Sequence, residues 1–249
     1  MKYERRPPVN TRDKPPMARL TGHRFMKPYI FLLMLSIPSL AVAAPPFGTA
    51  EGLFDLSNSK TLGLTTIPGE HVEIHHATEE SGFRFAHHPG LIAFKGRIYC
   101  SWSNGRVHED RPDQRVLYAS SADGSTWSAA RVLAAPPESV YGSCVAAGFH
   151  VHDENLVACF TLTHDYPTPN LQNEKNAAWA IVSQDGMDWG EPTKIASGFY
   201  IEAPRTLSNG RLFLGGEHTG EIWKSHQARM RLLYTDSANG IDGWKQAAI

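Results

Sequence analysis

From about residue 71 onward, short runs of alternating apolar and polar residues are separated by residues that favour turns. This pattern is typical of β-strands with one buried face, because the side chains of a strand point alternately to its two sides. It predicts a strand at His71–His75 and then four short strands at Gly90–Phe94, Arg97–Trp102, Val116–Ser120 and Ala130–Leu133. No long amphipathic helix pattern competes with this prediction.

The same set of strands returns twice. A second set is predicted at Cys144–Phe149, Leu156–Phe160, Ala178–Val182 and Thr193–Ile195, and a third at Tyr200–Leu207, Arg211–Leu214 and Met230–Tyr234. Each set places a Trp at a similar distance from its second strand, namely Trp127, Trp189 and Trp244. Repeated four-stranded antiparallel units predict an all-β protein with β-propeller architecture, although a β-sandwich also fits short strands with turn signals. Propellers close with about 4–8 blades, and about three are present, so the chain is expected to be truncated.

A turn motif marks the third strand of each set. Ser121–Trp127 has the sequence Ser-Ala-Asp-Gly-Ser-Thr-Trp, Ser183–Trp189 repeats it with Asp188 in place of Thr, and Leu233–Trp244 repeats it loosely. Asp can accept backbone N–H groups across the turn, Gly can adopt a positive φ, and Trp can cover the apolar face of the sheet. These are structural roles, so the motif indicates fold rather than chemistry.

Composition adds constraints on partners and redox state. The chain has 249 residues, of which 41% are hydrophobic and 20% charged, with a formal net charge of −1. This balance gives no general attraction to nucleic acid, so an anionic ligand must meet a local cluster of Arg, Lys or His. Three cysteines, Cys100, Cys144 and Cys159, are too few for a disulfide scaffold; buried thiols are favoured, and one disulfide stays open.

The N-terminus predicts export. Residues 1–44 are interpreted as a leader in which residues 26–44 have the basic start, apolar core and Ala-Val-Ala end of a signal peptide, with cleavage after Ala43 or Ala44. The apolar run is shorter than the roughly 20 residues of a membrane span and Pro38 interrupts it, so no stable span is expected after cleavage. We therefore predict a secreted or periplasmic domain at residues 45–249, with translation starting at Met26.

The turn motif resembles the Asp-box of the sialidase (neuraminidase) superfamily, in a form one residue shorter, and the resemblance covers roughly Phe83 to Trp244. It implies a propeller of six blades and an exo-α-sialidase-like glycoside hydrolase that acts on acidic glycans. In that family an Arg binds the sugar carboxylate, whereas the matching position here is His87. The resemblance assigns the acid/base to Asp110, with Asp113 as second choice, and the carboxylate that polarises a nucleophilic Tyr to Glu202. The family's Tyr comes from a late blade, beyond the end of this chain.

The densest polar cluster predicted at one rim combines His87 and His88 with Arg106, His108 and Asp110. Imidazoles exchange protons near neutral pH, Arg binds carboxylates bidentately, and a carboxyl group in a cleft can act as a general acid. A solvated charged loop is the simpler alternative.

A second chemistry also fits the paired histidines. Some propellers, such as ulvan lyases, cleave uronate-containing polysaccharides by β-elimination with a His or Tyr base. Here His88 or His108 would be the base, and Arg205 or Arg106 would neutralise the carboxylate. A non-catalytic glycan-binding propeller is the third hypothesis. The histidines at 150, 152 and 164 lack a recognised ligand spacing, and we predict no metal and no cofactor.

Overall fold

Residues 50–165, 173–220 and 230–247 are described in this computed structural model, in which the chain divides into the units Met1–Ile67 and Pro68–Ile249. In the first unit the described residues form turns, and the Asp55 carboxylate accepts the Ser57 N–H at 2.9 Å. The predicted signal peptide lies outside the described residues.

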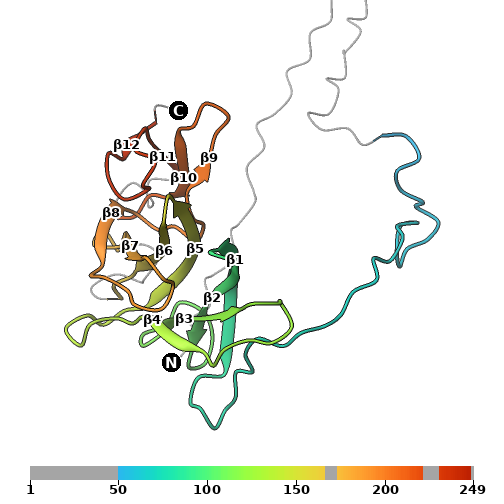
Figure 1. Ribbon diagram of the computed structural model, residues 1–249, viewed down its shortest axis with the longest axis horizontal. Helices are drawn as coiled ribbons and strands as arrows, with labels where there is room; N and C mark the ends of the chain where they lie inside the picture. Colours follow the sequence, from blue (N-terminus) through green and yellow to red (C-terminus); the bar gives the residue numbers. More distant parts are fainter. Residues whose placement is uncertain (1–49, 166–172, 221–229, 248–249) are drawn as a thin grey trace, which may run out of the picture. The chain divides into compact units, whose positions relative to one another are not determined.

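The second unit contains three four-stranded antiparallel sheets, each built from strands that are consecutive in sequence (Figure 1). We call them blades 1 to 3. Blade 1 consists of β1 (Phe85–Phe94), β2 (Arg97–Gly105), β3 (Arg115–Ser121) and β4 (Arg131–Ala134). Blade 2 consists of β5 (Cys144–His152), β6 (Asn155–Leu162), β7 (Ala177–Ser183) and β8 (Thr193–Ser197). Blade 3 consists of β9 (Arg205–Thr206), β10 (Leu212–Glu217), β11 (Met230–Thr235) and β12 (Lys245–Gln246).

The predicted all-β class and the three repeated sheets are confirmed, whereas two predicted strands are wrong. His71–His75 has no strand structure; it lies against blade 1, where Ile74 packs on a buried cluster and the His75 ring lies 5.2 Å from the Trp102 ring. The strand predicted at Tyr200–Leu207 is reduced to β9. Tyr200, the first residue of the predicted strand, instead bonds to the Thr161 hydroxyl. Its N–H donates to that oxygen at 3.0 Å, and its carbonyl accepts from the hydroxyl at 2.6 Å.

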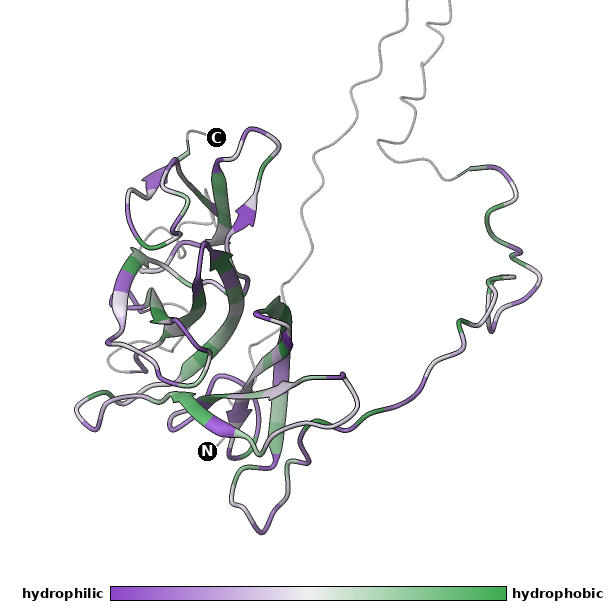
Figure 2. Ribbon diagram, in the orientation of Figure 1, coloured by the Kyte–Doolittle hydropathy of each residue, from purple (hydrophilic) through white to green (hydrophobic). Residues whose placement is uncertain are grey.

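Apolar side chains between neighbouring sheets form the core. Figure 2 shows that apolar residues lie along the strands, while β9 is hydrophilic. One buried cluster joins blade 1 to blade 2 and includes Phe94, Tyr99, Tyr118, Phe149, Leu156 and Phe160. Gly90 of β1 and Gly148 of β5 let these two strands approach, since a Cβ on Gly90 would lie 3.0 Å from the Gly148 Cα. The three cysteines are free and buried, and burial raises the thiol pKa of Cys100 to about 11 and that of Cys159 to about 12.

The three turns predicted from the repeat share one hydrogen-bond scheme. We call Ser121–Trp127, Ser183–Trp189 and Thr235–Trp244 the blade turns. In the first, one Asp123 carboxylate oxygen accepts the N–H groups of Ser125 and Thr126 at 2.8 and 2.7 Å, and Gly124 has φ +80°. Asn239 replaces the Asp in the third turn and accepts the Ile241 N–H at 2.8 Å. The degraded third copy therefore keeps the turn geometry.

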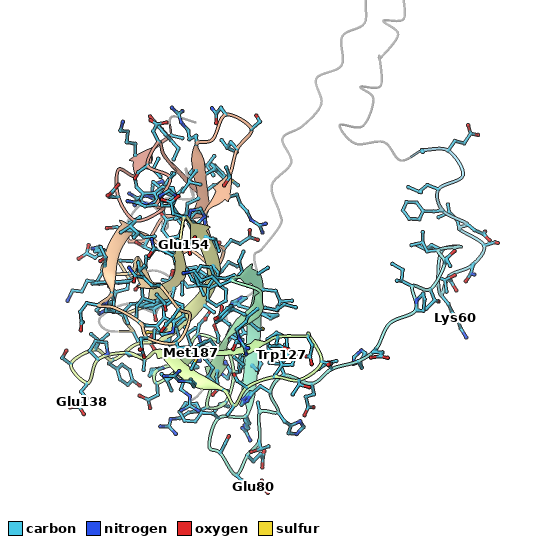
Figure 3. The ribbon with its side chains drawn as sticks, viewed as in Figure 1. Lys60, Glu80, Trp127, Glu138, Glu154 and Met187 are labelled. Carbon is cyan, nitrogen blue, oxygen red and sulfur yellow. The ribbon has the colours of Figure 1, made fainter. Side chains whose placement is uncertain are left out.

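The second and third blade turns each contact the blade that precedes them. The Tyr99 and Tyr118 hydroxyls of blade 1 donate to the carbonyls of Asp185 and Met187 at 3.1 and 3.3 Å, and Figure 3 labels Met187 in this turn. The His150 ring of blade 2 lies 2.9 Å, through Nε2, from the Ala238 carbonyl oxygen of the third turn. These turns therefore connect neighbouring sheets as well as strands within one sheet.

Asp123→Asn is expected to destabilise the protein at neutral pH, by an amount that shrinks in acid. The N–H groups of Thr126 and Ser125, followed by the Ser121 hydroxyl, hold the pKa of Asp123 below its usual range. The lowered pKa stabilises the folded state fully above the unfolded pKa of about 3.9, and this contribution is lost as pH falls through the folded pKa. Chemical denaturation of both proteins at several pH values measures the difference. A difference that does not change between neutral and strongly acidic pH would contradict this assignment.

Candidate functional site at one rim of the blades

The predicted cluster lies at one end of the strands, opposite the blade turns. The register pairs Phe85 with Gly105 and Asn104 with Arg115, so the start of β1 and the β2–β3 loop share a rim. Ile98 pairs with Ser121 at the other end, where the first blade turn begins. The expectation that the histidine pair and the loop carrying Asp110 share a rim is therefore confirmed.

The histidine pair lies on an irregular part of β1. The register shifts between His87 and Gly90, and His88 has φ +53°. The two imidazole rings lie 4.0 Å apart, and within the described chain the buried His88 Nδ1 has no hydrogen-bond partner. Burial lowers the pKa of His88, as does the neighbouring His87, while Asp110 and Glu109 oppose the shift. The ring is thus biased towards the neutral form, which can accept a proton.

Asp110 lies half-buried beside these histidines. It has φ +52°, a left-handed conformation that is uncommon outside glycine but tolerated by Asp. Burial raises the pKa of its carboxyl group, and the neighbouring His87, His88 and Gln114 oppose the shift. A carboxyl group that keeps its proton above the usual Asp range suits a general acid.

Gln114 connects the members of this cluster. Its side chain is fully buried, and its Oε1 lies 3.1 Å from His87 Nε2 and 3.0 Å from the Asp110 backbone nitrogen. Its Nε2 donates to the Cys144 carbonyl at 3.1 Å and lies 3.5 Å from Asp110 Oδ1. One amide group therefore links β1, the β2–β3 loop and β5.

A groove of about 660 Å³ brings His88 together with two other predicted residues. His88 lines it together with Glu202, on the segment that leads into β9, and Arg205, the first residue of β9. The Arg205 guanidinium donates to Glu202 Oε2 at 3.2 Å, and both side chains are largely exposed. The groove thus presents an imidazole and an exposed ion pair to solvent.

Two predicted residues have other partners. Arg106 Nε donates to Asp113 Oδ2 at 3.2 Å, and the guanidinium lies 4.5 Å from the centre of the Phe83 ring. His108 is exposed and its Nε2 accepts from Arg111 at 3.2 Å. The structure therefore brings His87, His88 and Asp110 together and puts Glu202 and Arg205 on the groove, while the partners it gives Arg106 and His108 lie outside the histidine cluster.

Sequence reasoning missed Gln114 and did not select Asp165 as an acid. Asp165 follows β6, donates its N–H to the Tyr141 carbonyl at 2.8 Å, and keeps Oδ1 buried with no hydrogen-bond partner among the described residues. Burial raises its pKa; the charge of Asp110 also acts to raise it, whereas Arg111 acts to lower it. The only feature of the sequence that marks Asp165 is that a polar residue follows an apolar strand. Many exposed positions have the same feature, so it does not identify a buried acid.

Neither a metal-binding cluster nor a membrane-spanning helix is found within residues 50–165, 173–220 and 230–247. No group of three or more His, Cys, Asp or Glu side chains in these ranges could hold a metal ion, and no helix there is long and apolar enough to cross a membrane. His150 contacts the Ala238 carbonyl, and His152 lies 3.2 Å from the Asp153 carboxylate.

The fold defined by these blades is that of the sialidase β-propellers. Trypanosoma rangeli sialidase, solved in complex with sialic acid, matches with a TM-score of 0.51 and 14% identity over 65% of this chain and 30% of that chain. The Hadza microbial sialidase Hz136 matches with a TM-score of 0.53 and 14% identity over 73% of this chain and 42% of that chain. The chain thus spans less than half the length of either sialidase. No protein-family model and no curated protein sequence matches it.

Proposed function

We propose that this propeller hydrolyses glycosidic bonds in acidic glycans, with Asp110 as the general acid. The observation that carries the proposal is the position of Asp110, half-buried at the rim beside His87 and His88 with a raised pKa. Protonation of the leaving oxygen is the step that glycoside hydrolysis requires of such a group. The sialidase fold supports glycans as the substrate class, because T. rangeli sialidase binds sialic acid on the same architecture.

Arg205 and Glu202 would act on the substrate from the groove. A guanidinium binds a sugar carboxylate through two parallel hydrogen bonds, so Arg205 is the proposed contact for the acidic group. Because Arg205 is paired with Glu202 in this structure, a bound carboxylate would compete with Glu202 for the guanidinium. Glu202 would then be available to polarise a nucleophilic Tyr, which the resemblance assigns to a later blade. Export through the signal at residues 26–44 would bring the protein to extracellular or periplasmic glycans.

One observation favours β-elimination as a second candidate. His88 lines the same groove as Arg205, and burial biases its imidazole towards the neutral, proton-accepting form. In this reaction His88 would remove the proton next to the uronate carboxylate, the bond from carbon to the glycosidic oxygen would break, and a carbon–carbon double bond would form. The leaving oxygen would take a proton from solvent, and His88 would later return its proton to solvent. Arg205 would stabilise the carboxylate as negative charge develops.

Reaction products test the proposal. The purified protein is incubated with sialyllactose, a sialylated glycoprotein and a uronate-containing polysaccharide, and free sialic acid, reducing ends and ultraviolet absorbance are recorded. Free sialic acid, or new reducing ends without ultraviolet absorbance, is expected for hydrolysis. An unsaturated, ultraviolet-absorbing uronate would identify the lyase instead. Glycan binding without either product would overturn both reactions and identify a binding propeller.

A further inference from the structure

Gln114 is a buried polar residue at a functional rim that no catalytic scheme above uses. It lies directly before β3, and its amide group contacts the side chain of His87, the backbone and side chain of Asp110, and the backbone of Cys144. Buried polar side chains are normally hydrogen-bonded, but one amide that serves three separate segments is more than its own burial requires. The contacts of the Gln114 amide are therefore best explained by the groups that they hold in place.

The orientation of the Gln114 amide is determined by two backbone groups. The Asp110 N–H can only donate, so the atom 3.0 Å away must be the carbonyl Oε1. The Cys144 carbonyl can only accept, so the atom 3.1 Å away must be the amino Nε2. The two constraints are independent and agree, which removes the usual ambiguity between the two ends of a Gln side chain.

This orientation determines how His87 is held. Oε1 cannot donate, so the His87 Nε2 that lies 3.1 Å away must carry a proton and donate it. The opposite ring nitrogen, Nδ1, lies 3.7 Å from Glu109 Oε2, which is on the same loop as Asp110. The ring of His87 is therefore held between Gln114 and the loop, with its centre 4.0 Å from that of the tilted His88 ring.

The same orientation holds Asp110 in its uncommon backbone conformation. A positive φ at Asp costs free energy unless surrounding contacts maintain it, and the bond from Asp110 N–H to Gln114 Oε1 is one such contact. The Gln114 amino group also faces Asp110 Oδ1 at 3.5 Å. Both the backbone and the carboxyl group of the proposed acid are thus aligned from one buried side chain.

We propose that Gln114 is the positioning residue of this site, which fixes the Asp110 carboxyl group and the His87 ring relative to each other. Only the expected effect of Gln114 on the rate of glycan cleavage rests on the proposed function. The positioning itself is a property of the folded protein that can be measured without a substrate.

The test compares Gln114→Met with the unchanged protein by amide hydrogen exchange and by kinetics. Met is similar in length but offers Asp110 no comparable acceptor, so exchange at the Asp110 amide is expected to become at least about tenfold faster, as for a bond that opens locally. On a substrate that the unchanged protein cleaves, kcat should fall by about 100-fold, the scale of a small misplacement of a reacting group, while KM changes little. Gln114→Glu, which keeps the Oε1 acceptor, should restore most of the exchange protection.

Thr161→Val is the matched control, because Thr161 is also fully buried, while its hydroxyl bonds the backbone of Tyr200 rather than Gln114 or Asp110. It should destabilise the fold without faster exchange at Asp110 beyond the global change. Unchanged Asp110 exchange in Gln114→Met would overturn the positioning proposal whatever the activity. Faster exchange with unchanged kcat would restrict Gln114 to a structural role. Faster exchange in a protein that cleaves no glycan would leave the positioning intact and reject the proposed function.

Discussion

Replacing Asp110 with Asn is expected to lower kcat on an acidic glycan by about 10²–10⁴-fold, the usual contribution of general acid catalysis. Asn fills the same space beside the histidine pair but cannot donate a proton to the leaving oxygen. Because only the protonated form of Asp110 is active as an acid, the rate of the unchanged protein should fall as pH rises through the Asp110 pKa. Burial places that pKa above the usual Asp range, so activity should extend to higher pH than an ordinary Asp allows.

The leaving group and a neighbouring carboxylate serve as controls for this prediction. A substrate with a nitrophenolate leaving group needs little protonation, so Asp110→Asn should slow it far less than a natural glycan. Asp113→Asn alters a carboxylate of the same loop that pairs with Arg106, and it should change kcat only slightly. Equal losses in the two variants would show that the loop, rather than the Asp110 proton, is what the reaction needs.

Gly186→Ala is expected to destabilise the protein by about 2–5 kcal/mol, from left-handed strain of about 1–2 kcal/mol and overpacking of about 1–3 kcal/mol. Gly186 has φ +75°, and a Cβ there would overlap the Tyr99 ring. Tyr99 is almost fully buried between blades 1 and 2 and cannot easily move away. Urea denaturation followed by Trp fluorescence measures the free energy of unfolding.

Gly96→Ala is the matched control, because Gly96 has nearly the same backbone angle, φ +73°, but open space where the Cβ would lie. It should cost only the conformational part, about 1–2 kcal/mol. If both variants lost the same stability, the contact between the second blade turn and Tyr99 would contribute nothing.

The fold could be predicted because it is repeated. Alternating runs and the recurring Trp after an Asp-Gly or Asn-Gly turn fixed three sheets, and the structure has them at the expected places. The two wrong strand predictions concern segments whose backbone does not pair with a neighbouring strand as predicted. His71–His75 alternates as a strand does but packs on Trp102 without pairing, and the residues before β9 bond to a Thr161 side chain rather than to a neighbouring strand.

The candidate site could be predicted only where residue type alone suggested chemistry. His87, His88 and Asp110 were found together because imidazoles and carboxyl groups stand out at the two ends of neighbouring strands. Gln114 has no such signature, since its role depends on reaching three segments at once. The partners of Arg106 were likewise hidden, because its position over Phe83 depends on the path of the loop.

The contacts of the blade turns also bear on the order in which the sheets can form during synthesis. The second turn needs the Tyr99 and Tyr118 hydroxyls, and the third needs the His150 ring, so each turn uses a surface made earlier in the chain. Domains generally fold from the N-terminus as they leave the ribosome, and repeated units gain most of their stability from the neighbour already present. The preceding blade would thus already be folded when the next blade emerges, and native structure would extend from the N-terminus in the direction of translation.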